Sequence, residues 1–134
     1  MLFLPCFADA QNSNVYSSCP PPEHSSWTEL LHRHVDSNGW VDYEGFQKDS
    51  IQLNGYLAQL SVCAPSDSWS NKEKLAYWIN VYNAYTVKLI VDHYPVASIK
   101  DIKKGIPFIN SVWEMDFFEI GGESFDLSKV EHGI

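Results

Sequence analysis

The stretch Leu75-Ala-Tyr-Trp-Ile-Asn-Val-Tyr-Asn-Ala-Tyr-Thr-Val87 decides the fold, because apolar side chains occupy almost every side of a helix drawn through it. Ser70-Asn-Lys-Glu73 precedes it as a capping box, in which a serine and a glutamate satisfy free N–H groups at a helix start. Tyr94-Pro95 follows as a stop signal, since proline disfavours helical backbone at the residue before it. The pattern therefore predicts one long helix over about 71 to 93, buried nearly all round as a central element would be.

Two asparagines, Asn80 and Asn83, interrupt this apolar helix one turn apart. An amide buried without hydrogen-bond partners costs about 1–3 kcal/mol, so both side chains need partners. Either they tie a neighbouring loop to the helix, or they line a pocket with Tyr82 and orient a ligand or a catalytic group. Asn80, Asn83 and Tyr82 are therefore the candidate binding residues.

Shorter elements are predicted before the long helix. Ser26 and Glu29 form another capping box, which opens a helix that Asn38-Gly39 ends. Residues 44 to 61 have the apolar spacing of a second helix.

After the long helix, the pattern changes to that of strands. Residues 113 to 120 and 124 to 127 are predicted strands that pair around the hairpin turn Gly121-Gly122. Ser128 and Glu131 have the spacing of a cap for a last helix. The predicted fold class is therefore α+β, with N-terminal helices and a long buried central helix packed near a small antiparallel sheet.

Composition and charge narrow the classes of function. The length of 134 residues suits one domain, and the formal net charge of -8 makes its surface acidic. Such a surface repels nucleic acid, because phosphate binding requires clustered Lys and Arg, and the chain groups only Lys100, Lys103 and Lys104. There is no apolar run of about twenty residues, so no membrane span is expected. No cofactor is expected either, and the partner stays open between a protein and a small-molecule ligand.

The first 25 residues differ in composition from the rest. Residues 1–10 form a short apolar run ending in Ala8-Asp-Ala10, which is typical of the end of a secretory signal with its cleavage site. The alternative is a merely apolar N-terminus, because the positively charged start of a signal is missing. Residues 11–25 are rich in Ser and Pro and predict a linker, which leaves 26–134 as a single domain. We expect an exported protein, secreted or periplasmic.

The cysteines fit this expectation. Cleavage after Ala10 would remove Cys6 and leave Cys19 and Cys63, an even number in an oxidising compartment. A disulfide between them would pin the Pro-rich leader to the domain, and the alternative is two unpaired thiols. Neither cysteine has a second Cys or a His at ligand spacing, so no metal is expected there.

Other patterns that imitate binding sites are incomplete. The segment from His34 to Phe46 resembles a calcium loop, with Gly39 in the glycine position, but His34 and Gly45 stand where the first and last ligands belong. His32 and His34 lie two residues apart and so face different sides of a helix. The tryptophans are scattered over different elements and are expected mostly in the core: Trp27, Trp40, Trp69, Trp78 and Trp113.

Five segments, in order and at matching spacing, resemble the motifs of one protein family. Leu75 to Val87 is similar to its central motif LAFWINxYNAxTV, and Phe125 to His132 resembles its SLxxIEH motif. Three more segments resemble its G-x-VDY, LxxYLxxL and hYPvkSI elements: Gly39 to Tyr43, Leu53 to Leu60 and His93 to Ile99. Over about residues 27 to 134 the chain therefore resembles the N-terminal and central part of the family named domain of unknown function 547.

This resemblance implies a fold and no established reaction. Members of the family continue past the Glu-His pair with a segment rich in Arg, His and Cys, which nothing here matches, because the sequence stops at Ile134. We therefore expect a domain truncated at its C-terminus.

Glu131 and His132, which the resemblance places in a family motif, are the candidate catalytic residues. A His near a carboxylate can act as a general base, but neighbours on a helix point about 100° apart, so each needs a partner elsewhere. Either His132 faces Asn80 or Asn83 across a pocket, or Glu131 caps the helix with Ser128 and His132 only ends its last turn.

Two classes of function remain open. One is a non-catalytic module that binds a protein or a cell-envelope ligand. The alternative is a hydrolase- or transferase-like pocket around the central helix, completed by residues downstream of this chain. We expect no independent enzymatic activity for the chain as it stands.

Overall fold

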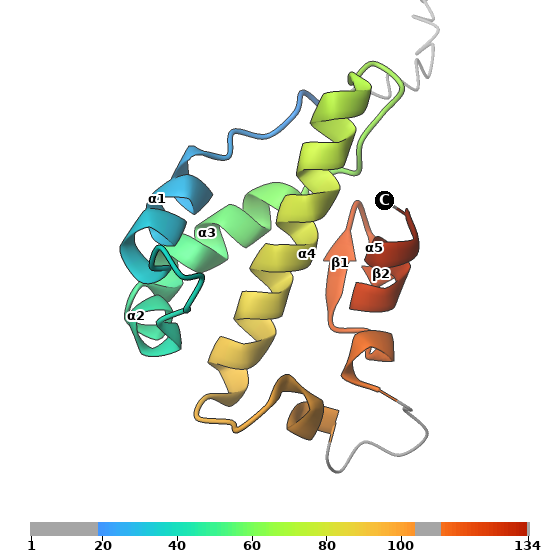
Figure 1. The fold of residues 1–134 in the computed structure, drawn as a ribbon. Coiled ribbons are helices and arrows are strands. Elements are labelled where there is room, and N and C mark those ends of the chain that lie inside the picture. Colours follow the sequence, from blue (N-terminus) through green and yellow to red (C-terminus); the bar gives the residue numbers. More distant parts are fainter. Residues whose placement is uncertain (1–18, 104–110, 134) are drawn as a thin grey trace, which may run out of the picture.

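The computed structural model describes residues 19–103 and 111–133 (Figure 1). In this part the helices come first and a two-stranded antiparallel sheet follows, before a last short helix. The predicted α+β class is confirmed. In chain order the elements are α1 (Ser25–His34), α2 (Tyr43–Lys48), α3 (Ser50–Ser61), α4 (Asn71–His93), the 3-10 helices η1 (Ile99–Lys103) and η2 (Val112–Glu114), β1 (Phe118–Ile120), β2 (Glu123–Phe125) and α5 (Leu127–Gly133).

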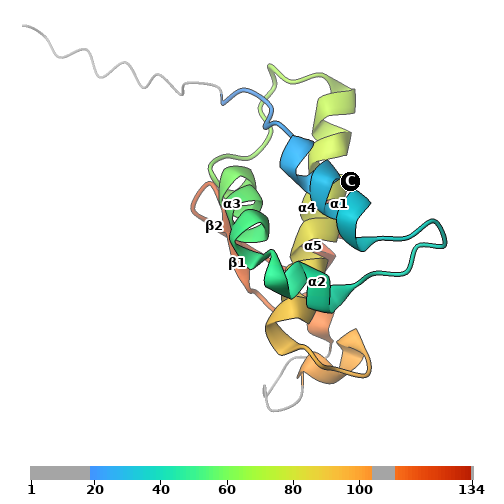
Figure 2. The same cartoon turned by 90° about the vertical axis from the view of Figure 1, so that its left-hand side faces the viewer.

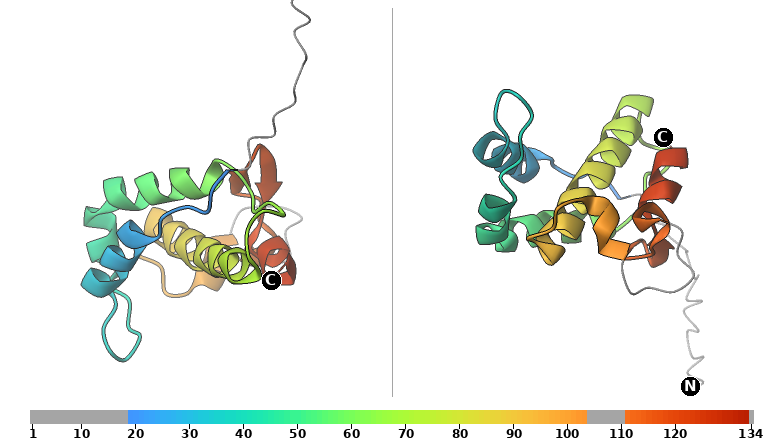
Figure 3. Two further views of the ribbon diagram at one scale, coloured as in Figure 1. Left: turned by 90° about the horizontal axis from the view of Figure 1, so that it is seen from above. Right: turned by 60° about the horizontal axis from the view of Figure 1, so that its bottom comes forward.

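Helix α4 is the central element, as predicted, and its bounds are those that the sequence indicated. Ser70 Oγ accepts a hydrogen bond from the Glu73 N–H at 3.2 Å, and the Ser70 N–H donates to Glu73 Oε2 at 2.7 Å, so the predicted capping box is confirmed. Figures 1 and 3 show α1, α2 and α3 on one side of α4, and the sheet with α5 on the other. The core therefore lies on two flanks of one helix.

The third flank of α4 faces outward. Leu75 and Ile79 are 48% and 43% exposed, and Asn83, one further turn along the same stripe, is also exposed. The prediction of a helix buried nearly all round is therefore wrong for this side. A helical wheel counts apolar residues, and it does not record which of them another element reaches.

Asp49 divides the predicted helix of residues 44 to 61 into α2 and α3. The Asp49 N–H donates to the Gly45 carbonyl, and the Asp49 carbonyl accepts from the Leu53 N–H, both at 3.1 Å, so Asp49 ends one helix and begins the next. Its carboxylate lies 2.6 Å from Arg33 Nη1. A tertiary contact of this kind favours a break at Asp49, since Asp is a weak helix former.

The predicted cap at Ser26 and Glu29 does not form. Helix α1 begins at Ser25, and the side chain of the preceding N-cap residue, His24, makes no capping hydrogen bond. The Glu29 carboxylate accepts instead from Gln52 Nε2 at 3.2 Å. A contact with α3 has replaced the local one.

The C-terminal elements are shorter than predicted. Residues 112 to 114 form η2, and β1 begins only at Phe118, so the predicted strand from residue 113 is mostly wrong. The cap of α5 comes from Asp126, whose Oδ1 accepts from the Lys129 N–H at 2.6 Å, in place of Ser128.

The hairpin itself agrees with the sequence. Phe118 pairs with Phe125 and Ile120 with Glu123, and the turn between the strands has φ values of 58° at Gly121 and 81° at Gly122. Glycine adopts positive φ values without strain, which is why the pair marks the turn.

Three buried tyrosines carry their hydroxyls into the core. Tyr77 donates to the Leu60 carbonyl at 2.6 Å, and Tyr85 donates to the Leu57 carbonyl at 3.3 Å. The Tyr56 hydroxyl lies 2.7 Å from His24 Nδ1. Each polar tip thus has a partner, which removes the cost of burying it.

Cys19 and Cys63 are joined by a disulfide, with their Cα atoms 6.4 Å apart. The Trp69 indole N–H also donates to the Cys19 carbonyl at 2.6 Å. The segment before α1 is thereby fastened to the end of α3 and to the start of α4. In the structure the two thiols are therefore paired.

We expect the tyrosines to ionise in two groups. Burial raises the pKa of Tyr85 to about 12, and it also raises the pKa of Tyr56 and Tyr77. Unfolded tyrosine loses its proton near pH 10 and the folded state resists this loss, so the free energy of unfolding falls as pH rises above about 10. Tyrosinate absorbance should show a late group that ionises together with unfolding, as followed by circular dichroism. Tyr85→Phe should remove one residue from this group, and a single early step would contradict the structure.

Loss of the disulfide should destabilise the domain. Replacing both Cys19 and Cys63 by Ser opens a cross-link spanning 44 residues, which lowers the free energy of unfolding by about 2–4 kcal/mol. Urea denaturation measures the change. Val62→Ala is the matched control, because Val62 adjoins the cross-link and is 69% exposed. Equal stability of the double variant and the control would refute a stabilising role for the cross-link.

Candidate functional site

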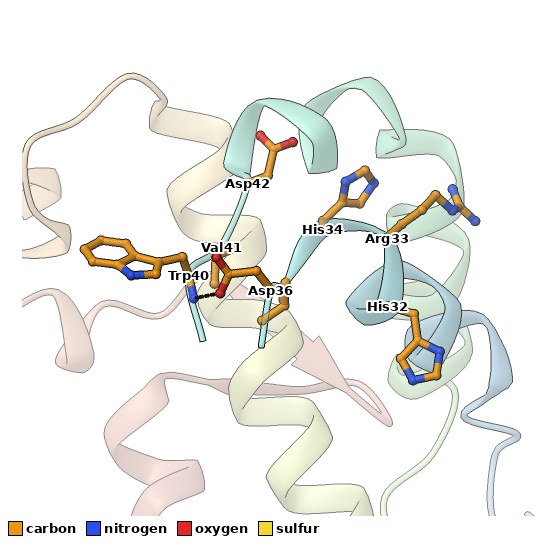
Figure 4. A pocket seen from close by; sticks show the side chains of 8 residues that line it. His32, Arg33, His34, Asp36, Trp40, Val41 and Asp42 are labelled. Carbon is orange, nitrogen blue, oxygen red and sulfur yellow. Dashed lines mark hydrogen bonds between the residues drawn. The ribbon is translucent and has the colours of Figure 1, made fainter. Parts of the chain in front are cut away.

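The loop between α1 and α2 borders a surface hollow of about 430 Å³ (Figure 4). Figures 2 and 3 show this loop projecting from the body of the domain. The residues that line the hollow come from the end of α1 and from the loop: His32, Arg33, His34, Val35, Asp36, Trp40, Val41 and Asp42. Polar, charged and aromatic side chains are therefore gathered within eleven positions of the sequence.

Backbone hydrogen bonds hold the loop in one shape. Val35 and Val41 form an antiparallel bridge, and the Asp42 N–H donates to the His34 carbonyl at 2.7 Å. Within the loop, Asp36 Oδ1 accepts from the backbone N–H groups of Asn38 at 2.8 Å and Trp40 at 3.0 Å. This arrangement is a side-chain-stabilised turn, which leaves the backbone little freedom.

Trp40 sits on this fixed loop with its side chain outward. The residue is 76% exposed, whereas Trp27 and Trp69 are 2% and 4% exposed in the core. The prediction that the tryptophans mostly serve the core therefore fails at Trp40. The sequence held one signal for this, because Trp40 directly follows the Asn38-Gly39 turn.

A charged cluster supports the floor of the hollow. Asp49 Oδ2 lies 2.6 Å from both Arg33 Nη1 and His34 Nε2, and Arg33 Nη2 donates to Gln52 Oε1 at 3.0 Å. The hydrogen bond from His34 and the one from Arg33 hold the pKa of the Asp49 carboxyl below its usual value. The His34 ring also packs on Phe46, with centroids 4.9 Å apart.

Gly45 packs closely against the His34 ring and the Asp42 carboxylate. A Cβ on Gly45 would lie closer than 3.0 Å to His34 Nδ1 and to Asp42 Oδ2, so a side chain there would force the imidazole or the carboxylate to move. Asp42 Oδ1 accepts from the Gly45 N–H at 2.9 Å and caps α2. The His34 side chain is only 10% exposed. His34 therefore serves to hold α1, α2 and Asp49 together, and the groups open to a ligand are those around it.

The hollow does not have the donor set of a metal site. Asp36 uses one carboxylate oxygen for the loop backbone, and His34 is engaged with Asp49. Among residues 19–103 and 111–133, no group of three or more His, Cys, Asp or Glu side chains could hold an ion. The calcium-like segment from His34 to Phe46 contains the end of α1, the Asp36 turn and the start of α2.

The candidate binding residues on α4 do not share one side. The Tyr82 hydroxyl accepts from the Trp113 indole N–H at 3.1 Å, and the Trp78 ring packs on Phe125 with centroids 5.7 Å apart. At 100° per residue, Asn80 and Asn83 lie about 160° and 140° around the helix from Trp78. The structure therefore turns Trp78 and Tyr82 toward the C-terminal elements, and the two asparagines away from them.

Glu131 and His132 lie exposed on α5. His132 Nδ1 is 2.7 Å from the Ser128 carbonyl oxygen and 3.4 Å from Ser128 Oγ. A carbonyl oxygen only accepts, so Nδ1 carries the proton and cannot take one from the serine hydroxyl. The contact ties His132 to its own helix and does not activate Ser128.

A second groove, of about 280 Å³, lies where α5 meets α4 and β2, and sequence patterns gave no sign of it. Trp78, Phe125 and Val130 make it largely apolar, and Lys129 Nζ lies 4.2 Å from the centroid of the Phe125 ring. Its two charged residues, Lys129 and Glu123, are paired with each other, and His132 does not line it. The hollow at Trp40 has the richer chemistry.

None of the helices in the described ranges is long and apolar enough to cross a membrane.

Comparison with known proteins identifies a family for the chain. No curated protein and no solved structure matches the chain. A protein-family model described as "Protein of unknown function, DUF547" matches residues 66–134, which include α4, the sheet and α5 and leave the hollow outside. Because the match covers about half of the sequence, the chain belongs to the DUF547 family.

Proposed function

We propose that this chain is a non-catalytic binding module whose ligand lies in the hollow beside Trp40. The observation that carries the proposal is an indole 76% exposed on a loop whose backbone is already fixed. Large exposed aromatic side chains on rigid supports supply contact area at a low cost in conformational entropy. Arg33 and Asp36, which also line the hollow, offer the few polar groups that orient a ligand.

The burial and hydrogen bonding of the histidines support a binding module without catalytic activity. His34 is the best-supported imidazole of the hollow, but its side chain is nearly buried and is bonded to Asp49. His132 is exposed and bonded to its own helix. The hydrolase- or transferase-like alternative needs His132 to face Asn80 or Asn83, and the direction of the α4 side chains gives this little support.

An exported location is part of the proposal. The signal-like residues 1–10 support it from the sequence, and the Cys19–Cys63 disulfide supports it from the fold, since such bonds persist in oxidising compartments. In this view, the module acts as a secreted or periplasmic protein. The domain of residues 26–134 would be the ligand-binding part.

Binding to an immobilised panel tests the function. The panel contains neutral glycans, acidic glycans, acidic peptides and basic peptides, and each is exposed to the chain and to Trp40→Ala. We expect at least one class to bind and Trp40→Ala to weaken that binding about tenfold or more, because the contact area of the indole is lost. Thermal stability should stay unchanged, since exposed side chains contribute little to it.

Ile51→Ala is the matched control, because Ile51 is an apolar residue 89% exposed on α3, outside the lining of the hollow. It should bind as the unaltered chain does. Binding that survives Trp40→Ala, chemical turnover of a panel member, or a panel without any binder would each count against the proposal.

A further inference from the structure

We infer that the ligand of the Trp40 hollow is a neutral saccharide, whose sugar ring stacks on the indole while its hydroxyls bond to the polar lining. The inference rests on the proposed function and names the class of ligand for the same site. It depends on the charges of the lining, on their remaining hydrogen-bonding capacity and on the position of Trp40.

Both signs of charge are fixed in the lining. Figure 4 shows Arg33 and His32 on the α1 side, and Asp36 and Trp40 on the loop side. Arg33 is pinned to Asp49 at 2.6 Å, and Asp36 is pinned to the backbone of its own loop. A cationic ligand would meet Arg33, and an anionic one would meet Asp36 and Asp42 as well as the net charge of -8. A neutral ligand avoids both penalties.

The lining can both donate and accept hydrogen bonds. A guanidinium has five N–H donors, and Arg33 directs Nη1 and Nη2 to Asp49 and Gln52, so donor capacity is left. Asp36 gives Oδ1 to two backbone N–H groups, which leaves Oδ2 as an acceptor. Sugar hydroxyls are donors and acceptors at once, so one ring edge can use both kinds of group.

The indole supplies the apolar half of the contact. A pyranose ring has a face of C–H groups and a rim of hydroxyls, and its C–H face packs on an aromatic ring. Because the Val35–Val41 bridge and the Asp36 turn hold the backbone of Trp40, only the two side-chain torsions of the indole remain to be ordered when a ligand binds. An open polyol with the same hydroxyls lacks this flat face.

The volume of the hollow favours a short saccharide. A volume of about 430 Å³ lies in the lower part of the range of about 300–1,000 Å³ that small-molecule sites occupy. The hollow is bounded by one loop and one helix end, so it would hold the end of a chain or a small oligosaccharide.

Titration calorimetry on the full chain tests the inference by measuring the affinities of matched ligands. Each ligand differs from the next in one property. The neutral ligands are cellobiose, maltose and chitobiose with N-acetyl groups, beside methyl glucoside. Glucosamine adds a positive charge, glucuronate adds a negative charge, and sorbitol removes the ring. We expect at least one neutral disaccharide to bind, with little dependence on salt, since no net charge is matched. Sorbitol should not bind, and both charged sugars should bind more weakly than methyl glucoside.

Variants of Trp40 test whether the sugar binds at the hollow. Trp40→Ala should weaken the neutral disaccharide about tenfold, Trp40→Phe should retain most of the affinity because a stacking face remains, and Ile51→Ala should change nothing. Tighter and salt-dependent binding of glucosamine or glucuronate would overturn the saccharide inference in favour of charge recognition. Trp40-dependent binding of a peptide from the panel, with no binding of any neutral sugar, would overturn it and leave the proposed function standing. Absence of any Trp40-dependent binding would overturn both.

Discussion

The carbonyl groups at the end of α3 are the constraint on which the rest of the structure depends. The last carbonyls of a helix lack partners within it and must find them elsewhere. Here the Leu60 carbonyl accepts from the Tyr77 hydroxyl of α4, and the Ser61 carbonyl accepts from the Gly121 N–H of the hairpin at 2.9 Å. Cys63, two residues on, carries the disulfide to Cys19. Three distant segments are thus fastened within four residues.

This fastening explains why α4 can be central although one of its flanks is open. Tyr77 is fully buried, and its ring meets Trp69 and Trp78 edge-on at centroid distances of 5.4 and 5.0 Å. Tyr85, two turns later, stacks on Phe118 at 3.8 Å. The aromatic residues on the inner sides of α4 therefore bind it to both flanks, and Leu75 and Ile79 on the outer side are not needed for this.

Capping and turn residues in the sequence were enough to predict α4 and the hairpin. The Ser70–Glu73 box and Pro95 define α4, and Gly121-Gly122 defines the hairpin, because each acts on backbone within a few residues. The break at Asp49 could not be found in this way, since it depends on Arg33, sixteen residues earlier. The open flank of α4 could not be found either, because periodicity marks apolar faces without saying what covers them.

The site was harder to predict than the fold for the same reason. Asn80 and Asn83 stood out because amides are unusual in an apolar helix, yet helical geometry turns both away from Trp78 and the elements it meets. Trp40 was grouped with the other tryptophans, and its place directly after the Asn38-Gly39 turn was the sequence signal that set it apart. Asp36 lies in the segment that resembles a calcium loop, whereas its actual partners are the backbone groups of its own turn. The structural role of each of these residues depends on its neighbours in the fold.

The hollow is connected to the core through few contacts, and these contacts affect the cost of binding a ligand there. His34 reaches Asp49 and packs on Phe46, which is fully buried, so the floor cannot shift without disturbing the packing of α2. The rim, in contrast, depends on hydrogen bonds within the loop itself. A ligand that meets a fixed floor and a prearranged rim pays little to order them, so its affinity depends mainly on the contacts it makes. Those contacts are the face of one indole and a few polar groups, which favours modest affinity and selection by the shape and charge of the ligand.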